Sequence, residues 1–248
     1  MNNKTYKKNF LTEVIFRIDF DQVKLGQLKK FAEKIKSRFP ISEEKRGEEG
    51  FVNLNLATKD FNHSANPLTF WEFHNKTRTK TIKIHPTSLS IEYTKYKNSP
   101  ELLKDIEFVP TFVKDFKVKT INRLGLRYVN QIKLLNKDFL DWNTYINDSL
   151  LGSLDFAKEQ EKSISRSMGQ MVFKKEDTNI NFGYGLWNSN FPNEINEKIF
   201  ILDFDEYSKF PLDTNEMNLT EEIKSYNKSI EELFESVIKE DLRKILKK

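Results

Sequence analysis

Cysteine is absent from this chain of 248 residues. The absence excludes a disulfide scaffold, a zinc site with thiolate ligands and a cysteine nucleophile. Histidine is scarce as well, since His63, His74 and His85 are the whole set and no two share an element at a spacing that presents two metal ligands. We therefore predict no metal site and no cofactor, and interpret the histidines as surface or hairpin residues. Only tertiary convergence would change that interpretation.

Long apolar runs are missing too. No uninterrupted apolar segment approaches the ~18–20 residues that span a bilayer. The first apolar run is interrupted by Glu13, Arg17 and Asp19, which is not typical of the core of a signal peptide. The expected location is the cytoplasm, without contact with a membrane.

The excess of positive charge is small, at +4 from 41 basic and 37 acidic residues. A dedicated nucleic-acid binder more often carries a concentrated basic stripe. The 21 Phe and 8 Tyr residues supply enough bulky apolar area for a packed core, so the chain is expected to fold.

Familiar catalytic signatures are also missing: the sequence has no P-loop, GxGxxG, GxSxG or HExxH motif. Gly183-Tyr184-Gly185 is too short to cradle a phosphate and falls in a predicted strand, where it indicates a bulge or close packing. We predict no catalytic residue. This favours a non-enzymatic protein and leaves an enzymatic activity as an open alternative.

Hydrophobic periodicity predicts an alternation of strands and helices. Strands are expected over residues 11–20, 51–56, 68–75, 79–85, 88–96, 120–134, 162–173, 179–187 and 198–207. Helices are expected over residues 23–39, 99–116 with Ser99 as the N-cap and a break near Pro110, within 138–157, and over 218–246. The charged segment 42–50 is expected to be a surface loop.

The pattern repeats at a nearly constant offset of 110 to 111 residues. The matched pairs are 12–18 with 122–128, 91–96 with 202–207, and Trp71 and Phe73 with Phe182 and Tyr184. We interpret this as an internal duplication with repeats at 1–117 and 118–248 that form one compact unit. The predicted fold is α+β: two degenerate β-α-β(3-4)-α repeats forming a curved antiparallel sheet covered by long helices on one side.

Two segments carry a family resemblance: Leu11-Thr12-Glu13-Val14 in the first strand, and Arg123-Leu124-Gly125-Leu126-Arg127-Tyr128-Val129-Asn130 in the middle one. They resemble a sporadically distributed family of uncharacterised prokaryotic proteins of about this length. Members often have a proline before the first leucine, where this chain has Phe10. The resemblance implies no established activity, and its patchy distribution is similar to that of mobile or antiviral-defence genes.

The candidate site consists of Glu13, Arg17, Arg123 and Arg127. Glu13 and Arg17 share one face of the first strand, and the two later arginines share one face of the middle strand on either side of Gly125. Two guanidinium groups flanking a glycine can form a clamp for an anion or a carboxylate. The alternative is a cross-strand Glu–Arg pair that sets the register of the sheet.

A carboxylate pair, Asp203 and Asp205, shares one face of a later strand. The pair is able to bind Mg²⁺ if a third acid converges on it. The matching segment of the first repeat keeps one acid only, so a solvated strand face is the favoured interpretation.

Three hypotheses for function follow. The first is a non-enzymatic protein-interaction module, such as a regulator, antitoxin or accessory subunit of a defence-type or mobile-element system, with another protein as partner and a homodimer as an alternative. The second is a small-molecule or anion binder, or an enzyme, that uses a groove between the repeats. The third is a nucleic-acid-binding protein. It requires clustering of the following basic residues on one face: Lys117, Lys119, Arg123, Arg127 and Lys133.

Overall fold

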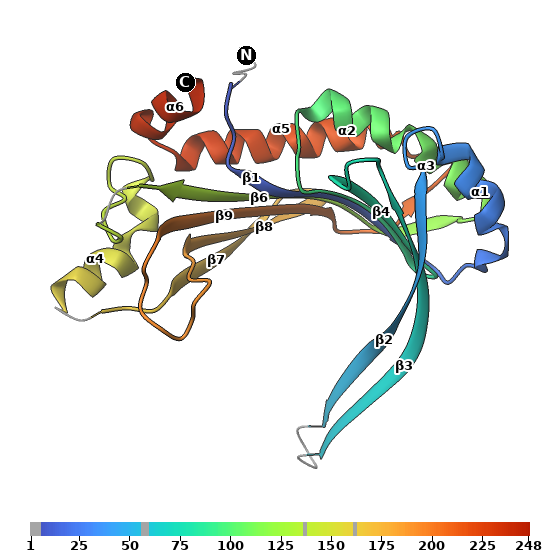
Figure 1. The fold of residues 1–248 in the computed structure, drawn as a ribbon, viewed down its shortest axis with the longest axis horizontal. Helices are drawn as coiled ribbons and strands as arrows, with labels where there is room; N and C mark the ends of the chain where they lie inside the picture. Colours follow the sequence, from blue (N-terminus) through green and yellow to red (C-terminus); the bar gives the residue numbers. More distant parts are fainter. Residues whose placement is uncertain (1–5, 56–59, 136–137, 161–162) are drawn as a thin grey trace.

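A single antiparallel sheet of ten strands organises the chain in the order β2-β3-β4-β5-β1-β6-β9-β8-β7, with β10 paired to β6 (Figure 1). This computed structural model describes residues 6–55, 60–135, 138–160 and 163–248, with the backbone but not the side chains of 48–55 and 60–67. The sheet does not close, so β2 and β7 are its edges. The strands are β1 Leu11–Phe20, β2 Ile41–Asn55, β3 Asp60–His74, β4 Lys80–His85, β5 Ser88–Tyr93, β6 Thr120–Leu134, β7 Ser167–Lys174, β8 Thr178–Leu186, β9 Lys198–Ser208 and β10 Leu212–Asp213.

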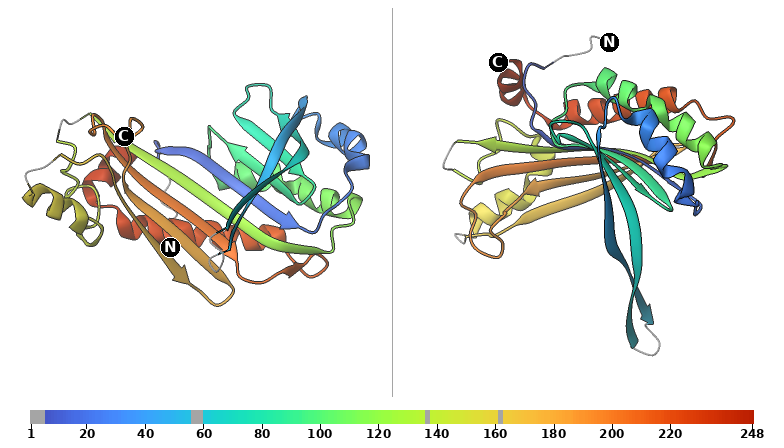
Figure 2. Two further views of the ribbon diagram at one scale, coloured as in Figure 1. Left: turned by 90° about the horizontal axis from the view of Figure 1, so that it is seen from below. Right: turned by 45° about the vertical axis from the view of Figure 1, so that its right-hand side comes forward.

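Helical segments α1, α2, α3 and α5 lie along one face of this sheet (Figures 1 and 2). The helices are α1 Leu28–Ile35, α2 Ser99–Asp105, α3 Val109–Asp115, α4 Gly152–Glu159, α5 Leu219–Val237 and α6 Glu240–Lys247, with 3-10 turns at Leu25–Gln27, Ile106–Phe108 and Asp148–Leu150. Every helix in the described part of the chain is too short or too polar to cross a lipid bilayer.

The two central strands, β1 and β6, alternate between a buried and a partly exposed face. On β1, Val14, Phe16 and Ile18 are fully buried toward the helices. Phe16 lies directly opposite Leu126 of β6, which is also fully buried. The alternation follows from the two-residue period of a strand and leaves the polar residues between them on the other face.

An aromatic cluster fills the space between α1, α3 and the sheet. The Phe31 ring meets the rings of Phe108, Phe112 and Phe116 edge-on, with centroids 5.4–5.9 Å apart. Phe20 at the end of β1 is 5.6 Å from Phe112. Such tilted and edge-to-face pairs stabilise the core beyond the area that they bury.

The predicted fold class is wrong, because in the described part of the chain no set of long helices covers the sheet: apart from α5, every helix has only seven or eight residues. The helix expected at 99–116 with a break near Pro110 is divided there, into α2 and α3 of seven residues each with the 3-10 turn between them. Pro110 lies in the first turn of α3, where its missing N–H leaves no helical acceptor unpaired, so it marks a new helix start. The N-cap of α2 is Asn98, whose side chain accepts from the Glu101 N–H at 3.0 Å, rather than Ser99.

The last predicted helix is also broken. α5 ends at Val237, and Ile238 adopts an extended conformation and pairs with Ile146 in an isolated bridge. α6 then begins at Glu240. Apolar spacing continues through the break, with Val237 and Leu242 both buried, so periodicity alone does not reveal it.

Segment 42–50, expected as a loop, belongs to strand β2. Residues Ile41–Asn55 pair with Asp60–His74 along the whole length of both strands. Only Trp71–His74 of β3 are also paired with β4, so the rest of the hairpin has no third strand beside it. The hairpin therefore projects from the sheet on the side opposite α5 (Figures 1 and 2).

The strands beside the central β1–β6 pair correspond for two positions on each side, beyond which β3 and β2 follow on one side and β7 follows on the other. β5 and β9 are the next strands outward, followed by β4 and β8. Two of the three matched segments thus occupy equivalent places, whereas Trp71 and Phe73 lie on β3 and their counterparts lie on β8. The duplication, and the boundary between residues 117 and 118, stay predictions.

Candidate functional site

Three of the four predicted site residues meet on the sheet face that the helices leave uncovered. Arg17 of β1 lies directly opposite Gly125 of β6, and Arg123 lies opposite Asp19. Arg127 is on the same face, two residues beyond Gly125. Antiparallel pairing of β1 with β6 thus converts distant sequence positions into neighbours.

Glu13 lies at an irregular point of β1, where the register against β6 shifts. It faces Val129 rather than an arginine. The pKa of Arg127 is raised chiefly by its hydrogen bond to Asp203, and the charge of Glu13 contributes less. The arginines of β6 take their carboxylate partners from β9 instead of from Glu13.

Ion pairs join the two β6 arginines to β9, and the pair made by Arg127 is bidentate. Arg127 donates from Nε and Nη2 to the two oxygens of Asp203 at 2.8 and 2.7 Å. Arg123 donates from Nη2 to both oxygens of Asp205 at 3.0 and 2.9 Å. Asp203 and Asp205, weighed above as a Mg²⁺ pair, therefore each hold a guanidinium.

The Arg123 guanidinium is held from several sides. Its Cζ lies 5.0 Å from the centre of the Tyr207 ring, a cation–π distance. On β6 it lies over Gly125, where a β-carbon would be 2.6 Å from its Nη1. Burial raises the pKa of the Asp205 carboxyl, and the adjacent Arg123 opposes that shift.

A shallow hollow of about 370 Å³ lies over these pairs. It is lined by Ile15, Arg17, Asp19, Ser90, Glu92, Arg123, Gly125, Arg127 and Asp205. Arg17 bonds to Asp19 at 2.6 Å, and Glu92 is paired with Lys83 at 2.7 Å. An anionic ligand would have to displace carboxylates that already occupy the arginines, and the clamp stays a prediction.

Three of the five basic residues proposed for nucleic-acid binding lie on β6 and are paired with carboxylates there, whereas Lys117 and Lys119 precede β6. Lys133 is paired with Glu197, and the two arginines are paired with aspartates. Binding to nucleic acid is favoured when lysines and arginines neutralise phosphates and thereby release the counterions condensed on the nucleic acid. Cations already paired with carboxylates neutralise fewer phosphates. The nucleic-acid hypothesis stays untested.

Edge strand β7 presents a different kind of surface. Lys175 N donates to Thr178 O at 2.9 Å across the β7–β8 turn. Hydrogen-bonded and non-bonded pairs alternate in an antiparallel ladder. The register with β8 therefore directs the backbone N–H and C=O groups of Met168, Gln170, Val172 and Lys174 to the outer edge, where no described strand pairs with them.

The side chains of this edge are mainly apolar. Met168 is 43% exposed and Val172 is 51% exposed, on the face of the sheet away from the helices. Phe173, on the opposite face, is also exposed. Lys174 is the single charged residue of the strand.

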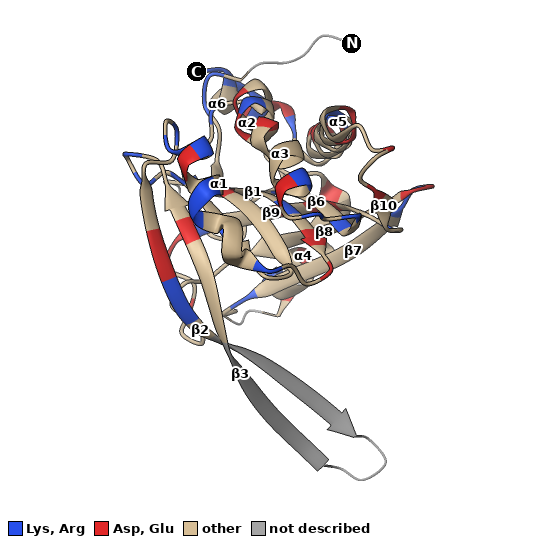
Figure 3. Ribbon diagram, turned by 90° about the vertical axis from the view of Figure 1, so that its right-hand side faces the viewer, with Lys and Arg blue, Asp and Glu red and all other residues tan. Residues whose placement is uncertain are grey.

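The other edge is protected by charge. β2 carries four consecutive charged residues, Glu43 to Arg46, close to the body of the sheet (Figure 3). Charges on an edge strand discourage pairing with another chain. The two edges of one sheet thus differ in their capacity to accept a further strand.

Gly185 allows β7 to approach β8 closely. Its φ is +136°, and a β-carbon there would lie 2.1 Å from the backbone oxygen of Ser167. Close packing at the Gly183-Tyr184-Gly185 segment, expected from the sequence, is confirmed. Only glycine fits both the backbone conformation and the space.

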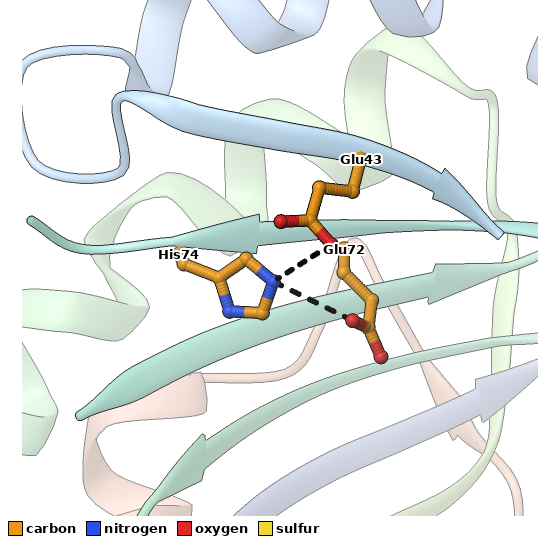
Figure 4. Close-up of side chains that lie close together, drawn as sticks. All are labelled: Glu43, Glu72 and His74. Carbon is orange, nitrogen blue, oxygen red and sulfur yellow. Dashed lines mark ion pairs between the residues drawn. The ribbon is translucent and has the colours of Figure 1, made fainter. Parts of the chain in front are cut away.

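A second cluster lies at the base of the β2–β3 hairpin, where Glu43, Glu72 and His74 point toward one another (Figure 4). His74 Nε2 is 3.4 Å from Glu72 Oε2 and 3.9 Å from Glu43 Oε2. His74 is buried and lies in the β2–β3 hairpin, so of the two expected environments, surface or hairpin, it occupies the second. His85 stacks on Phe70 with ring centroids 4.4 Å apart, and the side chain of His63 lies outside the described residues.

The sequence did contain a signal for this cluster. Glu72 and His74 are two residues apart in a strand, so both side chains fall on one face. Glu43 was not recognisable, because its segment was interpreted as a loop. Pairing of β2 with β3 is the step that adds the third residue.

The chain was compared with known protein families, with curated proteins and with solved structures, and none of the three comparisons found a match. What the protein does is therefore argued from its geometry.

Proposed function

We propose that the protein is a protein-interaction module that binds a partner by adding an extended segment to edge strand β7. The observation that carries the proposal is the outer edge of β7, where Met168 and Val172 combine unpaired backbone groups with exposed apolar side chains. Strand addition uses both features, because backbone hydrogen bonds supply affinity and alternate side chains supply specificity.

The contrast with β2 supports a role for this edge. A sheet that avoids association protects both edges, and within the described strands β2 carries four consecutive charges at Glu43–Arg46 whereas β7 carries one, Lys174. On the same face, Gln170 lies between Met168 and Val172, and its side chain donates to the Asn181 side chain of β8 at 2.6 Å. Apolar side chains interspersed with polar groups are typical of an interaction surface.

The partner is proposed to be a different protein with an extended apolar segment. This chain would then act as a regulator or accessory subunit of a defence-type or mobile-element system, the role that fits the family resemblance. A second copy of this chain, paired β7 to β7, is the alternative that the experiment separates.

Val172→Pro tests the proposal. The Val172 N–H points outward, so proline removes a donor from the free edge without removing a β7–β8 bond. Val172→Thr is the matched control, because it keeps the branched shape and the N–H. Tagged full-length chains are purified from the native host at low and high salt, and co-purifying proteins are identified by mass spectrometry.

A stoichiometric partner that survives high salt with the wild type and the threonine variant, and is lost with the proline variant, is the expected result. Amide hydrogen exchange in the complex should then show new protection at the amides of Met168, Gln170, Val172 and Lys174. Retention of the partner by Val172→Pro, protection located elsewhere, or recovery of a bare monomer would each refute the proposal. A dimer that Val172→Pro dissociates would assign the edge to a second copy.

A further inference from the structure

The cluster at the base of the hairpin places three potential metal ligands on one face of two paired strands. Glu43 of β2 is directly opposite Glu72 of β3, and His74 follows Glu72 at the next position on the same face. Like charges directly opposite each other in a sheet are destabilising unless a positive group lies between them. Lys45 and Arg78, which bond to Glu43, already supply positive charge on one side of this pair.

The His74 ring is oriented toward the carboxylates. Its Nδ1 is 3.0 Å from the Thr81 hydroxyl of β4, which leaves Nε2 facing Glu43 and Glu72. His74 is 8% exposed, and its buried Nε2 makes no hydrogen bond. A buried polar atom without a partner is costly, so its position calls for a ligand that it can bind.

The distances suit a small divalent ion. One donor atom from each of the three residues lies within 4.8 Å of the others. A tetrahedral Zn²⁺ with bonds of about 2.0–2.1 Å holds neighbouring donor atoms roughly 3.4 Å apart. The separation of 3.4 Å between His74 Nε2 and Glu72 Oε2 already meets this, and Glu43 Oε2, at 3.9 Å from the same nitrogen, has to move toward the ion.

We infer that Glu43, Glu72 and His74 form a site for a divalent transition-metal ion of the Zn²⁺ class. Three protein ligands with a water in the fourth position are a common arrangement for Zn²⁺. The imidazole nitrogen favours such an ion over Mg²⁺ or Ca²⁺, which prefer oxygen ligands throughout.

The neighbouring cations are compatible with the ion. Arg78 bonds to Oε1 of Glu43, and Lys45 bonds to Oε2 at 2.6 Å. Binding releases Lys45, which is 43% exposed, into solvent and leaves Arg78 on the other oxygen. Arg78 and Thr81 then hold the ligands from outside, the usual task of groups around a metal site. The ion joins β2 to β3 where the hairpin leaves the sheet.

Zinc titration of chelator-treated, dialysed full-length protein tests the inference, with calorimetry as the readout. One equivalent of Zn²⁺ is expected to bind and to raise the melting temperature. His74→Gln and Glu72→Gln should each weaken binding at least about tenfold and remove the thermal shift. The matched control, His85→Gln, changes another histidine of the same sheet and should bind as the wild type does.

Glu72→Gln keeps the size and shape of the side chain. If this variant melts at the same temperature as the metal-free wild type but no longer binds Zn²⁺, Glu72 is a metal ligand and is not required for folding. Absence of saturable Zn²⁺ binding overturns the inference. Binding that persists unchanged in His74→Gln and Glu72→Gln overturns it as well, because the ion then lies elsewhere.

Discussion

The guanidinium of Arg123 lies over the backbone of Gly125, so close that a β-carbon at position 125 would be 2.6 Å from Arg123 Nη1. From this position Arg123 reaches both oxygens of Asp205. The missing side chain at Gly125 provides the space in which the ion pair between β6 and β9 forms.

Gly125→Ala is expected to displace Arg123 and to break its pair with Asp205. The pair is only 30% and 22% exposed, so a carboxylate that is largely shielded from water loses its partner. We expect a loss of about 1–2 kcal/mol in the free energy of unfolding, measured by urea denaturation. Gly183→Ala is the matched control, since its β-carbon would meet Asp203 at an ordinary 3.7 Å. Equal losses in the two variants would contradict this account.

Gly185→Ala should be more damaging. The alanine side chain meets the backbone oxygen of Ser167 at 2.1 Å, and φ is +136°, which L-residues rarely adopt. We expect a loss of more than about 3 kcal/mol, together with faster hydrogen exchange along β7. A stability within error of Gly183→Ala would show that β7 does not depend on this close approach.

Lys198→Met tests a buried cation. Lys198 is 1% exposed, its Nζ bonds to the backbone oxygen of Asp141, and it lies 5.1 Å from the Trp142 ring. Burial lowers the pKa of its ammonium group, with Asp141 opposing the shift.

Because the folded chain binds this proton more weakly than the unfolded chain, the contribution of Lys198 to stability should rise with pH between its lowered pKa and the ordinary value of about 10.4. Other groups act in the opposite direction, since the pKa values of Lys80 and Tyr93 are raised in the folded chain. The test is therefore a difference: by urea denaturation across the alkaline range, the free energy of unfolding of the wild type should increase relative to that of Lys198→Met as pH rises. Lys224→Met, which removes an exposed lysine of α5, controls for net charge. Parallel curves for the wild type and Lys198→Met would contradict the assignment.

Local pattern was sufficient to predict most strands. The alternation of Val14, Phe16 and Ile18 indicates β1, and the expected strand 120–134 coincides with β6. Core residues have to match the two-residue period of a strand, so a half-buried strand is visible in the order of residues alone.

Helix lengths and the charged hairpin were not predictable in the same way. Pro110 indicated the division between α2 and α3, whereas apolar spacing continues across Ile238 although α5 ends there. The charged segment of β2 indicates a loop when its sequence is considered alone. It forms a strand because β3 supplies its hydrogen-bond partners. Pairing between distant segments decided these points.

Local periodicity was enough to identify the apolar residues at strand spacing and to assign Arg17, Arg123 and Arg127 to polar strand faces. It also identified the glycines that have larger residues on both sides. The tertiary structure decided which charge each arginine meets, which edge of the sheet stays open at β7, and that Glu43 joins Glu72 and His74. The physical reason is that burial follows from local periodicity, whereas an ion pair, an edge or a metal site depends on strand register, which is set by the packing of the whole sheet.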